Sequence, residues 1–250
     1  MPAYKMFGSG PCKVLALHNW FCDSSIYEPL LSYLDPSHFT FLFLDLRGYG
    51  VAKELKGDYS LQESVEDAIG LVRSQNWTTF HMVSHAMGTF IAQKIAIEYQ
   101  SLVKKMVVIS PIPASGLKKG EETVTFLEEA ALHNTEGALE CVQILTNRRY
   151  SPYITHKFVT KWQETSCQEA RLAYLHLLMN NSFINQARGL STPILAIFGE
   201  HDIENDQNTS QKTLSLLYPN LQIHTCKNVG HFPLQESPMQ LASWISTFLS

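Results

Sequence analysis

The residues that could do chemistry begin with the stretch 84–88, Ser-His-Ala-Met-Gly, which lies between an apolar run and a helical pattern. In the G-x-S-x-G pattern a strand turns sharply into a helix and raises the central side chain above the sheet, so the flanking residues must be small. Ser84 and Gly88 occupy the small positions, and Ala86 stands where a nucleophilic serine is expected. Two interpretations stay open from this stretch alone: a nucleophile elbow without its hydroxyl, or an ordinary strand-to-helix turn.

An acid and a base follow later in the chain, each just after an expected strand. Asp202 ends the stretch Phe-Gly-Glu-His-Asp, and His231 lies in Asn-Val-Gly-His-Phe-Pro. A serine needs an imidazole to take its proton, and the imidazole needs a carboxylate to fix its tautomer. The order nucleophile, acid, histidine is the one that such elbows require. Asp202 and His231 are therefore the predicted acid and base. The alternative interpretation is that Asp202 caps a loop and that His231 is a buried structural histidine.

Acyl transfer also needs two backbone N–H donors for the developing oxyanion, one after the nucleophile and one after an earlier strand. Met87 and Trp20 are the predicted donors, because the apolar run 14–17 leads into His-Asn-Trp-Phe at 18–21. By itself, a histidine after a strand is more typical of structure than of function. The stretch 45–50, Asp-Leu-Arg-Gly-Tyr-Gly, is interpreted as a turn held by Asp45 and Arg47.

Apolar runs of strand length alternate with helical patterns along most of the chain. The strands are expected at 14–17, 39–44, 80–83, 106–109, 194–198 and 221–225, and the helices at 26–34, 61–75, 87–99 and 238–249, with Ser60 as an N-cap. Strands that are apolar on both faces are typical of a parallel sheet covered by helices on both sides. The sequence thus predicts an α/β fold with a mostly parallel central sheet flanked by helices.

One interval interrupts this alternation. Residues 116–188 are expected to form a helical cap, with helices at 121–133, 135–145, 153–165 and 168–179, while 1–115 and 189–250 form the core domain. Such an insertion usually lies above the strand ends, where ligands bind in α/β sheets. Its aromatic residues predict a largely apolar pocket. The residues expected to contact the substrate are His18, Phe21, Tyr150 and Trp162.

Composition restricts the class of partner. The 250 residues carry a formal net charge of −4 and a pI near 6.2, which gives no field to attract nucleic acid or anionic lipid. No secretory signal and no apolar run long enough for a membrane span are apparent, so a cytoplasmic protein is expected. The five cysteines never occur as C-x-x-C, which predicts neither a disulfide framework nor a zinc site. The oligomeric state is left open.

Taken together, five motifs in order resemble the α/β-hydrolase superfamily, in particular its capped esterase-like members. The family's H-G-x motif is similar to residues 18–20, and its D-x-R-G-x-G motif to residues 45–50. Its G-x-S-x-G motif is similar to residues 84–88, its G-x-x-D motif to residues 199–202, and its late G-H motif to residues 230–231. The resemblance implies an α/β-hydrolase fold, a Ser-His-Asp acyl-enzyme mechanism, and no metal or organic cofactor. Asn19 and Ser84 depart from the pattern, since glycines are usual there.

The departure at Ala86 is the most consequential, because losing the serine of such a triad costs on the order of 10⁶ in kcat in subtilisin. The chain as given is therefore expected to be nearly inactive. Since Asp202 and His231 are both present, we favour a serine exchanged for alanine in a hydrolase of esters, thioesters or lactones with an apolar acyl part. The alternatives are a non-catalytic receptor, a C–C bond hydrolase, and an acyl-transfer cyclase with the same triad.

Overall fold

The chain is built around a seven-stranded sheet. A computed structural model describes residues 3–132, 134–202 and 207–250. The strand order is β1-β3-β2-β4-β5-β6-β7, in which β1 pairs antiparallel with β3 and every other pair is parallel. The strands are β1 (Ala3–Phe7), β2 (Cys12–Leu17), β3 (Phe39–Asp45), β4 (Phe80–His85), β5 (Val103–Ile109), β6 (Ile194–Gly199) and β7 (Leu221–Cys226).

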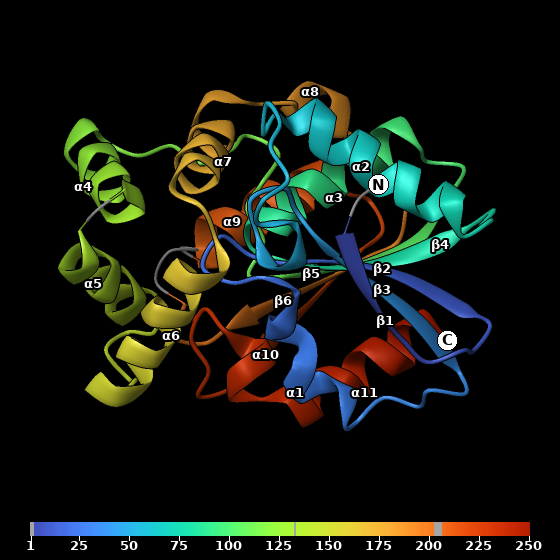
Figure 1. The fold of residues 1–250 in the computed structure, drawn as a ribbon. Helices are drawn as coiled ribbons and strands as arrows, with labels where there is room; N and C mark the ends of the chain where they lie inside the picture. Colours follow the sequence, from blue (N-terminus) through green and yellow to red (C-terminus); the bar gives the residue numbers. More distant parts are fainter. Residues whose placement is uncertain (1–2, 133, 203–206) are drawn as a thin grey trace.

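Helices cover both faces of this sheet, as the sequence predicts (Figure 1). On one face lie α2 (Leu61–Ser74), α3 (Met87–Glu98) and the short α8 (Ile184–Ala187); on the other lie α1 (Glu28–Leu31), α10 (Pro233–Glu236) and α11 (Pro238–Leu249). The helix α9 (Gln207–Leu217) ends beside α3, where Tyr218 donates a hydrogen bond to Gln93 at 2.6 Å. The predicted α/β class with a mostly parallel sheet is confirmed.

Two sequence predictions need correction. The strand β1 was not predicted, because its five residues are at most half-buried and give no continuous apolar run. The predicted helix 26–34 is wrong: Asp23 caps a 3-10 turn, Ser24–Tyr27, and only the four residues of α1 follow as α-helix. In contrast, α2 begins where predicted, since the Ser60 hydroxyl accepts the N–H of Glu63 at 3.1 Å.

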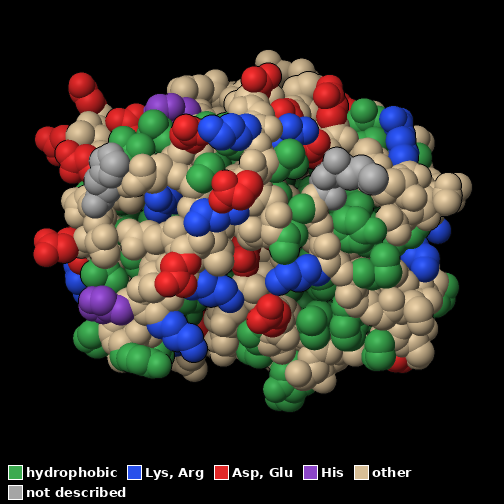
Figure 2. Space-filling view, in the orientation of Figure 1, with side chains coloured by type: hydrophobic (Ala, Val, Ile, Leu, Met, Phe, Trp, Pro, Cys, Tyr) green, Lys and Arg blue, Asp and Glu red, His purple; other side chains and the backbone are tan. Residues whose placement is uncertain are grey.

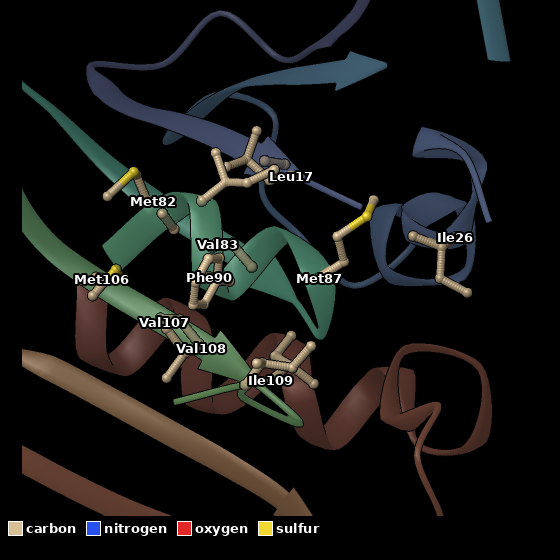
Figure 3. Close-up of a cluster of buried hydrophobic side chains, with 14 of the residues drawn as sticks. Leu17, Ile26, Met82, Val83, Met87, Phe90, Met106, Val107, Val108 and Ile109 are labelled. Atoms are coloured by element: carbon tan, nitrogen blue, oxygen red, sulfur yellow. The ribbon is translucent and has the colours of Figure 1, made fainter. Parts of the chain in front are cut away.

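The core under the site is formed by β2, β4, β5 and α3. Met82, Val83, Val107 and Phe90 are fully buried there. Figure 3 shows these side chains packed between the strands and α3, with Met87 reaching from the start of α3 toward Ile26. Because every residue of β4 is buried, the end of this strand is rigidly placed.

Between β5 and β6, the described residues form four longer helices before the short α8, and we call this segment, α4 to α7, the cap. They are α4 (Glu121–Leu132), α5 (Thr135–Leu145), α6 (Pro152–Thr165) and α7 (Gln168–Asn180). Their bounds agree with the predicted helices to within a residue; His133, where the first was expected to end, lies outside the described residues. Figure 1 shows the cap beside the sheet, at the end where the parallel strands finish.

The surface carries both signs of charge. Figure 2 shows Lys and Arg interspersed with Asp and Glu over the visible face, without a broad patch of one sign. This distribution fits the small net charge of −4. Within the described ranges, no helix is long and apolar enough to cross a membrane.

Candidate active site

Ala86 lies at the sharp turn between β4 and α3. Its backbone angles are φ 45° and ψ −111°, a conformation that non-glycine residues rarely adopt. The N–H of Ala86 donates to the carbonyl of Ile109 on β5 at 2.9 Å, and its carbonyl accepts the first bond of α3 from Thr89 at 2.8 Å. The turn is therefore a sharp, strained connection from strand to helix.

The surroundings of Gly88 and Ser84 explain why small residues occupy these two positions near Ala86. A Cβ on Gly88 would lie 2.6 Å from the carbonyl oxygen of Leu17 and 2.7 Å from that of His18, so only glycine fits between the elbow and β2. Ser84 is fully buried in β4, and its hydroxyl donates to the carbonyl of Val107 at 3.3 Å. Serine in place of the usual glycine is thus accommodated.

Asp202 and His231, predicted as acid and base, are in contact. His231 Nδ1 lies 3.0 Å from each carboxylate oxygen of Asp202, and both residues are buried. Because a carboxylate only accepts, Nδ1 carries the proton in the neutral ring and Nε2 is the basic nitrogen. Asp202 follows β6, and His231 lies in the loop between β7 and α10. The arrangement can therefore take a proton at Nε2.

The loop carrying His231 is held from both sides. Its N–H donates to the carbonyl of Leu145, the last residue of α5, at 3.2 Å. Its carbonyl accepts from His85 Nε2 at 2.7 Å and from the hydroxyl of Ser110 at 3.2 Å. Nearby, Arg149 of the cap pairs with Glu236, whose carboxylate also accepts the N–H of Gly230. The cap and the core thus both restrain the histidine.

The two predicted oxyanion donors have defined environments. Met87 is the first residue of α3, so its N–H belongs to the first helical turn, which has no intrahelical acceptor. Trp20 is held at three points: its carbonyl accepts from the Tyr49 hydroxyl at 3.0 Å, its indole N–H donates to the carbonyl of Arg171 at 2.8 Å, and its ring lies 5.1 Å from that of Trp162. Cap residues therefore take part in fixing Trp20.

His18 holds the peptide bond that carries the N–H of Trp20. Its Nε2 accepts the N–H of Leu46 at 3.1 Å, so its proton is on Nδ1, which donates to the carbonyl of Asn19 at 2.7 Å. In a trans peptide the carbonyl and the following N–H point in opposite directions. The bond from His18 therefore sets the direction of the Trp20 N–H.

A cavity of about 520 Å³ adjoins these groups. Its floor includes Ala86, Met87, His231 and Trp20, and its walls come from the cap and from the segment after β5. The apolar side chains that line it are Phe21, Ile112, Leu117, Phe126, Leu127, Cys141, Ile144, Leu145, Leu175 and Leu178. The other polar lining residues are Asn19, Lys119, Glu122 and Thr123, of which Asn19 is buried and Glu122 and Thr123 are exposed. The interior therefore suits an apolar group.

Of the residues predicted to contact substrate, Phe21 lines this cavity, whereas His18, Tyr150 and Trp162 do not. Both ring nitrogens of His18 bind backbone groups, and Trp162 is fully buried behind Trp20 and Phe21, so substrate contact by these residues stays a prediction. Tyr150 packs on Phe158 and Phe232.

Most of the cap residues in the cavity walls were not predicted as site residues from the sequence. Their signal was present, because Cys141, Ile144 and Leu145 of α5, and Leu175 and Leu178 of α7, repeat at three- and four-residue spacing.

Asp45 and Arg47 hold turns, as the structural interpretation predicts. The Asp45 carboxylate accepts the N–H groups of Ser24 and Val51, at 2.7 and 2.9 Å. Arg47 forms a two-pronged pair with Asp67, with N–O distances of 2.6 and 2.9 Å, and this hydrogen bonding to the Asp67 carboxylate is the main reason that the pKa of Arg47 is raised. These contacts fix the loop after β3, where Tyr49 reaches Trp20.

Comparison with known proteins agrees with this geometry. Residues 13–238 match the family model described as alpha/beta hydrolase fold. The chain belongs to this family. Among curated members, it is similar to a 2-(acetamidomethylene)succinate hydrolase of Mesorhizobium japonicum, with 24% identity over 97% of this chain and 89% of the relative. It is also similar to a pimeloyl-[acyl-carrier protein] methyl ester esterase of Yersinia pseudotuberculosis, with 23% identity over 96% and 94% of the two chains.

Solved structures of this alpha/beta hydrolase family show the same fold. An enol-lactonase from Burkholderia xenovorans superposes with a TM-score of 0.86 over 99% of this chain and 95% of its own, at 18% identity. A hydrolase from Oleispira antarctica gives a TM-score of 0.87 over 99% and 94%, at 15% identity. Sequence and structural relatives thus include hydrolases of several bond types.

Proposed function

We propose that this chain has the site of a serine hydrolase for carboxylic esters, thioesters or lactones with an apolar acyl part, and that Ala86 occupies the position of the nucleophile. The observation that carries the proposal is that Ala86, Met87, Trp20 and His231 line one cavity, while His231 is bonded to Asp202. In this proposal the chain as given binds such molecules with almost no turnover.

With serine at position 86, the proposed mechanism needs no group beyond these residues. The serine oxygen attacks the carbonyl carbon, its proton passes to Nε2 of His231, and the carbonyl electrons move to an oxygen held by the N–H groups of Trp20 and Met87. Collapse of this intermediate breaks the bond to the leaving group, which takes the proton from His231. Water, activated by His231, then releases the acid. Alanine lacks the attacking oxygen, so this sequence cannot begin.

The cavity supports the proposed substrate class. Its volume of about 520 Å³ lies within the usual range for small-molecule sites, and its walls are apolar except at the exposed end. An acyl chain would lie against Phe126, Ile144 and Leu175, with its carbonyl near Met87. Relatives named as an ester esterase and an enol-lactonase are consistent with ester and lactone chemistry, while 2-(acetamidomethylene)succinate hydrolase leaves other bonds open.

Ala86 itself favours a second candidate, a non-catalytic receptor that uses the same cavity for recognition. The two candidates differ in the expected effect of Ala86→Ser: a hydrolase would gain turnover, whereas a receptor would not. A C–C bond hydrolase and an acyl-transfer cyclase share the proposed triad, and they would differ from an esterase in the products of the repaired chain.

The decisive experiment is to prepare Ala86→Ser and to assay both forms on chromogenic esters and acyl thioesters of increasing chain length, with products identified by mass. We expect turnover to rise by several powers of ten, on the order of the 10⁶ effect of the serine in subtilisin. His231→Ala in the Ala86→Ser background should remove it. If the serine form turns over nothing while both forms bind apolar acyl compounds equally, the receptor replaces the hydrolase.

A further inference from the structure

Asn19 places an amide side chain where the related motif usually has glycine, directly before the proposed oxyanion donor Trp20. It is only 2% exposed, and its Nδ2 lies 3.0 Å from Nδ1 of His85, the residue before Ala86. The other ring nitrogen of His85 contacts the carbonyl of His231 at 2.7 Å. Asn19 is thus joined through one ring to the loop of the proposed base.

The direction of each bond in this chain can be deduced. A carbonyl only accepts, so Nε2 of His85 must carry a proton toward His231. Burial, and next the nearby His231, lower the pKa of His85 to about 3, so the ring is neutral near pH 7. Its Nδ1 is therefore bare and accepts from the Asn19 amide. The side-chain N–H of Asn19 donates, and its orientation is fixed.

Asn19 is consequently held at two ends. His18 holds its main-chain carbonyl at 2.7 Å, and His85 holds its side-chain amide at 3.0 Å. The peptide bond between Asn19 and Trp20, which carries the proposed oxyanion donor, lies between these two anchors. A glycine at position 19 would keep the first anchor and lose the second.

We propose that Asn19 and His85 are positioning residues that tie the Trp20 oxyanion donor to the loop carrying His231. The proposal rests on the proposed function, because it assigns these two groups to one reaction. The donor follows β2 and the base follows β7, so no strand pairing joins them directly. The His85 ring bonds to Asn19 through Nδ1 and to the carbonyl of His231 through Nε2, and it thereby couples the position of the donor to that of the base. Errors of about 1 Å between such groups can cost about 10²-fold in rate.

The first test uses the chain as it is and needs no activity. In ¹⁵N spectra of histidine side chains, assigned with His85→Asn, His85 should stay in the Nε2–H form between about pH 5 and pH 8. The backbone amide of Trp20 should give one sharp resonance, and Asn19→Gly should broaden or split it and shift the ring signals of His231. The proposal would be overturned if Nδ1 of His85 carried the proton. It would also be overturned if Asn19→Gly left the signals of Trp20 and His231 unchanged.

The second test measures turnover in the Ala86→Ser background, with folding of each variant checked by thermal unfolding. Asn19→Gly should lower kcat by about 10- to 100-fold and leave KM within about threefold, because the apolar side chains that line the cavity are unchanged. A loss confined to KM would contradict a positioning role. If Ala86→Ser itself has no activity on any ester, the proposed function fails, and the spectra still decide whether Asn19 and His85 hold Trp20.

Asn19→Asp is the conservative variant in the same background. A carboxylate only accepts, so it can face Nδ1 of His85 only when that nitrogen gains a proton. Its activity relative to the Asn19 parent should therefore rise as the pH falls from about 8 to about 6, when the charged pair forms. A constant ratio across this range would show that the bond to His85 does not control catalysis.

Discussion

The backbone at Ala86 has φ 45° and ψ −111°, a conformation that residues other than glycine rarely adopt. Strained angles of this kind cost of order 1 to 3 kcal/mol, and they persist only where surrounding contacts enforce them. Here the Ile109 carbonyl and the start of α3 enforce them. The chain therefore maintains a strained turn at the position where the proposed function places the nucleophile.

This strain can be measured by Ala86→Gly, since glycine adopts positive φ without a Cβ clash. The gain is reduced by the extra freedom of glycine in the unfolded chain. We expect the free energy of unfolding in urea to rise by about 1 kcal/mol.

Ala92→Gly is the matched control, because Ala92 is fully buried in the regular interior of α3. It should lower the free energy of unfolding by about 1 kcal/mol or more. Equal destabilisation by both substitutions would mean that position 86 is not strained.

At the scale of elements, the cap is attached to the loop of His231 mainly through the turn between α5 and α6. Arg149 pairs with the largely buried carboxylate of Glu236 and also donates to the carbonyl of Asn228. Its neighbour Arg148 pairs with Glu140, but both of those side chains are exposed. Adjacent arginines thus form ion pairs in different environments.

Arg149→Met should destabilise the protein by about 2 kcal/mol, because it leaves the Glu236 carboxylate without its cation. Arg148→Met should change stability by no more than about 0.5 kcal/mol, as is usual for an exposed pair. Hydrogen exchange should also become faster at residues 228–231 in Arg149→Met alone. Similar effects of the two substitutions would show that the Arg149 pair does not anchor this loop.

The elements also show what sequence patterns can and cannot reveal. Parallel strands were predictable because burial on both faces leaves continuous apolar runs, as in β3. The edge strand β1 was not, because pairing on one side leaves it partly exposed. The contacts of Asp202 with His231 followed from motif order, whereas the bond from Asn19 to His85 joins residues 66 positions apart and leaves no periodic pattern.

For the whole molecule, buried neutral histidines determine how stability depends on pH. The pKa of His85 is lowered to about 3 and that of His81 to about 4, in both cases mainly by burial. In the unfolded chain their pKa is near 6.5. As the pH falls below about 6.5, the unfolded state therefore binds more protons than the folded state, and stability decreases toward about pH 4.

In urea unfolding, we expect the contribution of these two histidines to the free energy of unfolding to be constant between about pH 7 and pH 8. Below about pH 6.5, the loss per pH unit should approach about 1.4 kcal/mol for fully buried His85 and be smaller for His81. His81→Gln should reduce the slope between about pH 6 and pH 5. A free energy that is flat from pH 7 to pH 5 would contradict this account.

The tilted contact between the rings of Trp20 and Trp162 at the cavity floor has a consequence for the fluorescence of the protein. Of the four tryptophans, Trp20 lines the cavity, and its ring lies 5.1 Å from the fully buried ring of Trp162. A molecule that enters displaces solvent from one indole of a coupled pair. We therefore expect the intrinsic fluorescence of Trp20 to report occupancy of the cavity, without any label and without turnover.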